Sequence, residues 1–164
     1  MTTIVYDGKS LVSDSQSAIG PEIYEEDCQK LFPEVGPFAV LGIAGNYQDC
    51  MDVIDIIGEY MKVEQIRNLD YEELGWECIM IGITHDGQLW HYTGRDSFQL
   101  RPDLPFAIGS GDAYALGAMY AGADAKKALE AAARYDLYTN NVIQEAFLTE
   151  GPELPPEQPT NKPH

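Results

Sequence analysis

The first thirty residues contain three kinds of group that could act together in catalysis: a hydroxyl, a carboxylate and an ammonium. Thr2 and Thr3 follow Met1, and Asp14 comes next, followed 16 positions later by Lys30. A threonine with a free α-amine combines a nucleophile and a base, because an amine with a pKa of about 7.7–8.0 can accept the hydroxyl proton. A nearby ammonium would lower the pKa of that hydroxyl, and a carboxylate would hold the ammonium in place. On these residues alone, an ordinary salt bridge between Asp14 and Lys30 is the simpler interpretation.

The elements that must position these groups can be predicted from hydrophobic periodicity and turn residues. Residues 15–29 are expected to form a loop with one short strand near Ile23, and residues 33–37 a second loop. Residues 63–75 fit a short helix or a loop, and residues 142–148 a last strand or a helical turn. The other expected elements are strands at 2–6, 10–13, 38–44, 79–84, 88–92 and 106–109, and helices from 46 to about 62, 113–121 and 125–135, with Asn46 and Asp124 as N-caps.

Two expected strand-to-helix junctions contain glycine. The apolar strand at 38–44, which has the pattern of a strand covered on both faces, leads into Gly45. A backbone N–H at such a turn can donate to the oxyanion of a tetrahedral intermediate, so Gly45 is a candidate donor. Gly45 can equally be only a tight turn. The second junction is Ile108-Gly109-Ser110-Gly111.

Together these residues resemble the proteasome β-subunit family, most closely the bacterial HslV peptidase and related phage-encoded versions. In that family Thr-Thr opens a strand, an Asp follows the second strand, a Lys comes after it, and a Gly lies at the strand-to-helix turn. Here Gly45 follows Lys30 by 15 residues, close to the family's spacing, and Ile108–Gly111 and Asp136–Thr139 match two further motifs. The resemblance extends from residue 2 to about residue 145. It departs from the family in a shorter first hairpin and in having only Met1 before the threonine.

The resemblance implies an α+β fold, the four-layer αββα sandwich of antiparallel sheets of the N-terminal nucleophile hydrolases. It also implies a threonine-type peptidase in which Thr2 is the nucleophile and the base. Gly42 would lie at the floor of the pocket for the substrate residue before the cleaved bond, where a missing side chain leaves room for a large apolar or neutral residue. The catalytic residues that the resemblance implies are Thr2, Asp14, Lys30, Gly45, Ser110, Asp136 and Thr139, the last three orienting the amine of Thr2.

Three functions from different classes fit these features. The first is a peptidase that cleaves peptides or unfolded proteins inside a homo-oligomer, which the resemblance implies together with an ATP-dependent unfoldase as partner. The apolar stripe of residues 50–61 favours association through helices. The second is a catalytically silent assembly or binding protein that retains Met1, whose presence blocks the amine. The third is an amidase or acylase for small molecules, since a fold does not fix its substrate.

The amino-acid composition limits the classes of binding partner and the cell compartment that can be expected. The 164 residues include 27 acidic and 10 basic residues, a net charge of −17, which disfavours nucleic-acid binding. Neither a signal peptide nor an apolar run of membrane-spanning length is found, which favours the cytoplasm without membrane contact. The three cysteines form no CxxC pair, and His85 and His91 lie in no zinc-ligand motif, so neither a metal nor a cofactor is expected.

The domain organisation is simple. Residues 1–150 are expected to form a single domain, since this length supports one core. Residues 151–164 contain five prolines, and such a segment is expected to be a flexible tail outside the fold.

Overall fold

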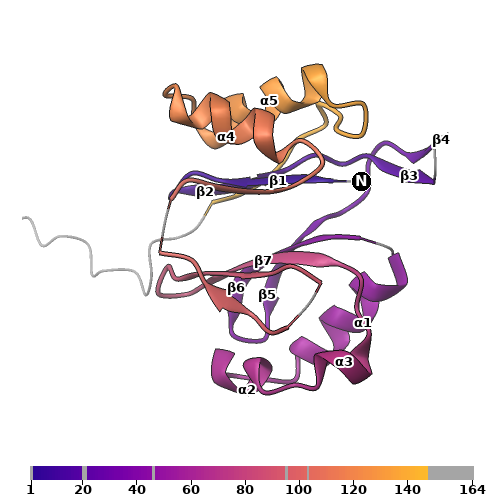
Figure 1. Cartoon of the computed structure of the whole chain (residues 1–164), viewed down its shortest axis with the longest axis vertical. Coiled ribbons are helices and arrows are strands. Elements are labelled where there is room, and N and C mark those ends of the chain that lie inside the picture. The colour runs from indigo at the N-terminus through magenta and orange to yellow at the C-terminus, as the bar shows by residue number, and fades with distance from the viewer. Residues whose placement is uncertain (1, 20–21, 46, 95, 103, 148–164) are drawn as a thin grey trace, which may run out of the picture.

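The computed structural model describes residues 2–19, 22–45, 47–94, 96–102 and 104–147. Two antiparallel sheets face each other, and helices cover the outer face of each (Figure 1). The predicted four-layer αββα sandwich is therefore confirmed. The predicted tail at 151–164 and the N-cap predicted at residue 46 lie outside the described residues.

The first sheet has the strand order β10-β1-β2-β11. Its strands are β1 (Thr3–Tyr6), β2 (Ser10–Ser13), β10 (Phe106–Gly109) and β11 (Gln144–Phe147). Strand β1 is an inner strand, paired with β2 on one side and with β10 on the other, where Thr3 lies opposite Gly109. Residues 142–148, for which strand and helical turn were both open, contain the strand β11. The start of the chain is thus fixed between strands that come early and late in the sequence.

The second sheet follows chain order from β5 to β9. Its strands are β5 (Leu31–Val35), β6 (Phe38–Ala44), β7 (Ile79–Thr84), β8 (Leu89–Tyr92) and β9 (Gln99–Leu100). The loop predicted at residues 33–37 is wrong, because Pro33 pairs with Val40 inside β5. Strand β5 is an edge strand, where a proline can face outward without removing a ladder hydrogen bond. The short strand predicted near Ile23 is present as β4 (Glu22–Glu25), and it forms a separate hairpin with β3 (Ser17–Ile19), which was not predicted.

Strand β6 is buried on both faces, as its apolar run predicted. Leu41 and Ile43 contribute to the core beneath the helices, whereas Val40 and Ala44 contribute to the core between the two sheets. This alternation follows from the two-residue period of a strand.

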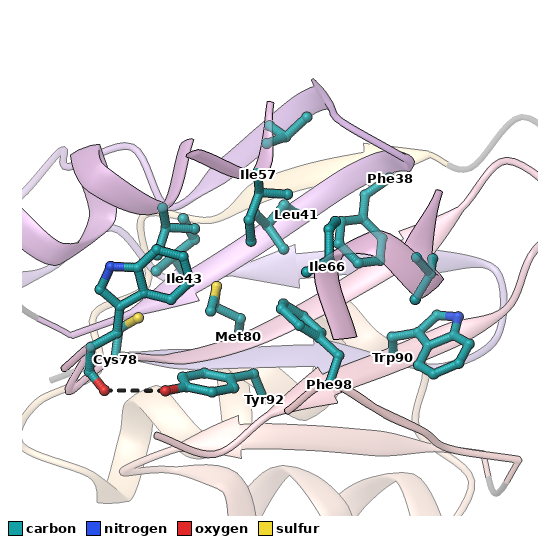
Figure 2. Close-up of a cluster of buried hydrophobic side chains, with 14 residues drawn as sticks. Phe38, Leu41, Ile43, Ile57, Ile66, Cys78, Met80, Trp90, Tyr92 and Phe98 are labelled. Carbon is teal, nitrogen blue, oxygen red and sulfur yellow. Dashed lines mark hydrogen bonds between the residues drawn. The ribbon is translucent and has the colours of Figure 1, made fainter. Parts of the chain in front are cut away.

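Three helices cover the second sheet: α1 (Tyr47–Ile57), α2 (Val63–Arg67) and α3 (Tyr71–Leu74). Figure 2 shows the core beneath them, a cluster that includes Leu41, Ile43 and Tyr92. The Tyr92 hydroxyl donates to the carbonyl of Trp76. Helix α1 ends at Ile57 and not near Lys62 as predicted, in keeping with Gly58, a weak helix former, at the next position.

The apolar stripe of residues 50–61 is mostly covered by the chain's own core. Val53 and Ile57 are fully buried, and Cys50 and Ile54 are partly buried against the same cluster. The inference that this stripe is larger than one layer needs is therefore wrong for the part in α1, because its side chains pack on the second sheet, whereas Met61 beyond the helix is exposed.

Two alanine-rich helices cover the first sheet: α4 (Asp112–Tyr120) and α5 (Ala125–Tyr135). Ala128 and Ala132 of α5 are fully buried and share a cluster with Val5 and Val12 of the sheet. Asp124 caps α5 as predicted, since its side chain accepts a hydrogen bond from the Lys127 N–H. None of the helices in the described ranges combines the length and apolar content needed to cross a lipid bilayer.

Candidate functional site

Thr2 lies beside the junction between β10 and α4. Its carbonyl accepts a hydrogen bond from the Ser110 N–H at 3.0 Å, and the residue is 6% exposed. Gly109, with φ of +104°, makes this approach possible, because a Cβ there would lie 1.6 Å from the Thr2 carbonyl oxygen. The sequence Gly109-Ser110 therefore holds the backbone of Thr2 at the end of the first sheet.

Asp14 and Lys30 form a buried ion pair. The Lys30 Nζ lies 2.9 Å from the Asp14 Oδ1, and both side chains are almost completely buried. The Thr3 N–H also donates to Asp14 Oδ1, at 2.9 Å, which connects the pair to the residue after Thr2. Lys30 is therefore paired with Asp14. Burial lowers the pKa of Lys30, and the carboxylate of Asp14 opposes this shift.

The Lys30 ammonium has three N–H donors. One donates to Asp14 and a second to the Gln16 carbonyl, at 2.5 Å. Within the ranges described above, no acceptor is found for the third, and no hydrogen bond joins Lys30 to the Thr2 hydroxyl. The pair thus lies next to the first strand with one donor available.

Ser110, Asp136 and Thr139 come together through one carboxylate oxygen. The Ser110 hydroxyl donates to Asp136 Oδ2 at 2.6 Å, and the Thr139 hydroxyl donates to the same atom at 2.5 Å. Asp136 is the C-cap residue of α5, and its Oδ1 accepts the Tyr138 N–H. These three residues, separated in the sequence, therefore form one hydrogen-bonded group beside Thr2.

Gly45 lies at the turn between β6 and α1, as predicted. Its φ is +152°, and a Cβ there would lie 2.7 Å from the Cβ of Cys78. The backbone consequently runs close to β7 at this turn. The role of the Gly45 N–H as an oxyanion donor stays a prediction.

Gly42 faces the core between the sheets. A Cβ at this position would lie 3.0 Å from Ile4 and 3.1 Å from Ile81. The expectation that the missing side chain leaves room for substrate is wrong, because these two isoleucines already fill that space.

Two amides near the ion pair were not predicted. The Asn140 N–H donates to Asp14 Oδ2 at 3.3 Å, and the Asn140 side chain accepts the Ser15 N–H. Gln144 accepts the Lys30 N–H at 2.9 Å and donates to the Cys28 carbonyl at 2.5 Å. Their partners lie more than a hundred residues away in the sequence, and no motif marks either residue.

Two of the thiols and the potential metal ligands can be assessed in the described residues. Burial raises the pKa of Cys50 to about 11 and that of Cys78 to about 12, so both thiols are protonated at neutral pH and weakly nucleophilic. No group of three or more histidine, cysteine or acidic side chains in the ranges above is arranged to hold a metal ion.

Comparison with solved structures identifies the architecture. Eukaryotic HslV from Trypanosoma brucei superimposes with a TM-score of 0.68 at 22% identity, covering 88% of this chain and 97% of that one. The chain therefore has the fold of HslV. Thiobacillus denitrificans BPH matches with a TM-score of 0.66 at 19% identity. The structure of BPH in complex with epoxomicin matches with a TM-score of 0.68 at 19% identity. Each of these two matches covers 90% of this chain and 98% of the BPH chain.

The likeness to HslV concerns the fold, because the identities are low. No protein-family model matches the sequence, and no curated protein matches it. The fold predicted from the resemblance to HslV is confirmed by these structures, which at 19–22% identity show nothing of this chain's chemistry.

Proposed function

We propose that the chain is a threonine peptidase in which Thr2, freed of Met1, attacks peptide bonds. The observation that carries this proposal is the buried Asp14–Lys30 pair, tied by the Thr3 N–H to the strand that starts beside Thr2. A buried ammonium is costly, so a pair without a task is often replaceable by apolar side chains. Its position next to a threonine, on a fold shared with HslV, supports a role in activating the hydroxyl.

The proposed reaction uses both functional groups of Thr2. The free amine takes the hydroxyl proton while the oxygen attacks the peptide carbonyl carbon, and the amine then passes the proton to the leaving amine. The acyl ester that forms on Thr2 is cleaved by water in the same way. The third N–H of Lys30 would donate to the Thr2 oxygen and stabilise its developing negative charge.

Two other parts of the site would support this reaction. The Gly45 N–H would donate to the oxyanion from a turn that runs close to Cys78. Ser110 and Thr139, fixed by their shared bonds to Asp136, would hold the amine of Thr2 in position. Substrate binding at Gly42 is not part of the proposal, because its side of β6 is filled by the core.

We further propose that the peptidase works as a homo-oligomer on peptides or unfolded proteins, with an ATP-dependent unfoldase as its partner. Large apolar side chains are exposed near the end of α5, and contiguous exposed patches of this kind mark association surfaces. Tyr135 is 65% and Leu137 is 87% exposed, and the Tyr135 ring stacks on Tyr114 of α4 at 5.8 Å.

The decisive experiment combines intact mass with hydrolysis of a short fluorogenic peptide amide. We expect the purified protein to lack Met1, because a methionine before a threonine is a usual substrate of methionine aminopeptidase. Thr2→Ala should abolish hydrolysis while the circular dichroism spectrum stays unchanged, whereas Thr2→Ser should retain part of the rate because it keeps a hydroxyl. A Thr2→Ala variant that hydrolyses the peptide at the wild-type rate would disprove the threonine mechanism.

The same measurements separate the alternatives. A protein that retains Met1 and hydrolyses nothing would be the silent assembly or binding protein. A protein without Met1 that stays monomeric and hydrolyses only small amides would be an amidase or acylase.

A further inference from the structure

Thr3 contacts both halves of the candidate site. Its N–H donates to Asp14 Oδ1, the carboxylate oxygen that also holds the Lys30 ammonium. Its side-chain oxygen Oγ1 lies 2.7 Å from Thr139 Oγ1 and accepts the Gly111 N–H at 2.9 Å. No part of this residue is exposed to solvent. Thr3 therefore connects the ion pair to the group around Asp136.

The direction of the hydrogen bonds along this connection follows from proton counting. The Thr139 hydroxyl has one proton, which it donates to Asp136 Oδ2. The bond between Thr3 and Thr139 must then use the proton of Thr3, with Thr139 as acceptor. The result is a one-way chain from the Gly111 N–H through Thr3 and Thr139 to the carboxylate of Asp136. Each bond in such a chain polarises the next, so the chain is more rigid than its bonds taken singly.

The Thr3 and Thr139 hydroxyls both lie close to Gly111. A Cβ on Gly111 would lie 2.6 Å from Thr3 Oγ1 and 3.2 Å from Thr139 Oγ1. Without the Thr3 hydroxyl, the buried Gly111 N–H would have no acceptor in this place and Thr139 would lose its donor. Thr139 and Asp136 would then be free to shift, together with Ser110.

We infer that Thr3 is a positioning residue, whose hydroxyl fixes Ser110, Asp136 and Thr139 relative to Thr2 through this chain of hydrogen bonds. The inference rests on the proposed peptidase function, since it assigns Thr3 a part in the same site. Thr3 touches no reacting atom in this scheme and acts only through its neighbours. Its loss should lower kcat and leave KM nearly unchanged, because substrate contacts are not involved.

The test compares three substitutions in the full chain by peptide hydrolysis. Thr3→Val keeps the shape and removes the hydroxyl, and should lower kcat on the order of a hundredfold, the cost of misplacing a catalytic group by about 1 Å. Thr3→Ser keeps the hydroxyl and should restore most of kcat. Thr139→Val breaks the chain at its next link, and the double variant should lose little more than either single one, because both remove the same chain.

A buried threonine elsewhere serves as the matched control. The Thr84 hydroxyl accepts the Gln88 N–H at 3.0 Å and donates to Asp86 in the turn between β7 and β8, where it has no contact with the site. Thr84→Val should lower the melting temperature and leave kcat unchanged. If Thr3→Val proves too unstable to purify, Thr3→Cys takes its place, because a thiol keeps the size of the side chain and is only a weak donor and acceptor.

The outcomes distinguish this inference from the function on which it rests. An active wild type whose Thr3→Val variant keeps kcat, or loses it no more than Thr84→Val does, overturns the role of Thr3 alone. Fully additive losses in the double variant also overturn it. A wild type that lacks Met1 and hydrolyses no peptide overturns the peptidase proposal itself.

Discussion

The Asp14 carboxylate has four hydrogen-bond partners in the described residues. Its two oxygens accept hydrogen bonds from the Lys30 ammonium and from the backbone N–H groups of Thr3, Gln16 and Asn140. These donors come from four separate parts of the chain. The carboxylate is therefore a structural centre as well as a candidate member of the catalytic machinery, and its two roles can be separated by substitution.

Asp14→Ala is expected to lower the free energy of unfolding by about 3–5 kcal/mol, because it leaves a buried ammonium without its counter-charge. Lys30→Met should cost less, since the three backbone N–H groups still satisfy the carboxylate. Urea unfolding followed by circular dichroism measures both values. A Lys30→Met variant that is less stable than Asp14→Ala would contradict this order.

His91 predicts a pH dependence of stability. Its ring is buried near Arg101, and burial together with this positive charge lowers its pKa below the ordinary value of 6.5. Below pH 6.5 the unfolded chain therefore binds a proton that the folded chain does not, so stability falls as the pH is lowered towards the folded pKa. Urea unfolding at pH 7.5 and pH 5 should show the wild type losing more stability than His91→Gln. An equal loss in both proteins would exclude His91 as the source.

Only part of the residue-scale organisation could be predicted from the sequence. Asp14 and Lys30 were found from their order and spacing, and the ion pair between them is present. Asn140 and Gln144 were missed, because their hydrogen bonds depend on β11 and the end of α5 packing beside β2 and β5. No local pattern encodes such contacts. Gly42 was misinterpreted because sequence does not reveal which neighbour fills the space beside a glycine.

At the scale of elements, a sequence pattern predicted the structure correctly where the structure depends only on the residues in that pattern. The Asp7-Gly8 and Asp86-Gly87 pairs predicted hairpins that the structure contains, because their turn geometry depends on those residues alone. Pro33 was misleading because proline excludes only an inner strand, and the position of a strand within its sheet is a tertiary property.

Gly45→Ala tests how firmly the turn between β6 and α1 is held. Because φ is +152° and a Cβ would overlap Cys78, we expect a loss of about 1–3 kcal/mol in unfolding free energy. Gly75→Ala is the control, since Gly75 has φ of +62° with open space around it and should cost only the left-handed backbone penalty of about 1–2 kcal/mol. Equal losses at the two positions in urea unfolding would show that Cys78 does not constrain the turn.

At the scale of the whole molecule, the two outer layers differ in how they meet solvent. The layer of α1 to α3 buries its large side chains in an aromatic core, whereas the layer of α4 and α5 packs small alanines inward. Tyrosine and leucine side chains near the end of α5 point outward instead, as their exposure shows. Because of this difference, we place the proposed contact between two copies of the chain on the layer of α4 and α5.

Sedimentation at micromolar concentration should therefore give a mass well above the 18.2 kDa of one chain. Leu137→Glu should shift the protein towards the monomer, because it places a charge in the apolar patch. Met61→Glu is the matched control on the opposite layer, since Met61 is 85% and Leu137 is 87% exposed. A wild type that sediments as a single chain, or equal dissociation in the two variants, would disprove an assembly through α4 and α5.

The inner position of β1 has a consequence for the order of events during synthesis. Thr3 pairs with Gly109, so about a hundred residues must be added after β1 before its second neighbour exists. At about 5–20 residues per second, β10 emerges roughly 5–20 s after β1, and the segment with Asp136 and Thr139 emerges later still. A nascent copy on the ribosome consequently carries its threonine, its ion-pair residues and its first turn long before the groups that would orient them. Such a chain would lack a complete candidate site, and therefore the proposed peptidase activity, until Asp136 and Thr139 have been added.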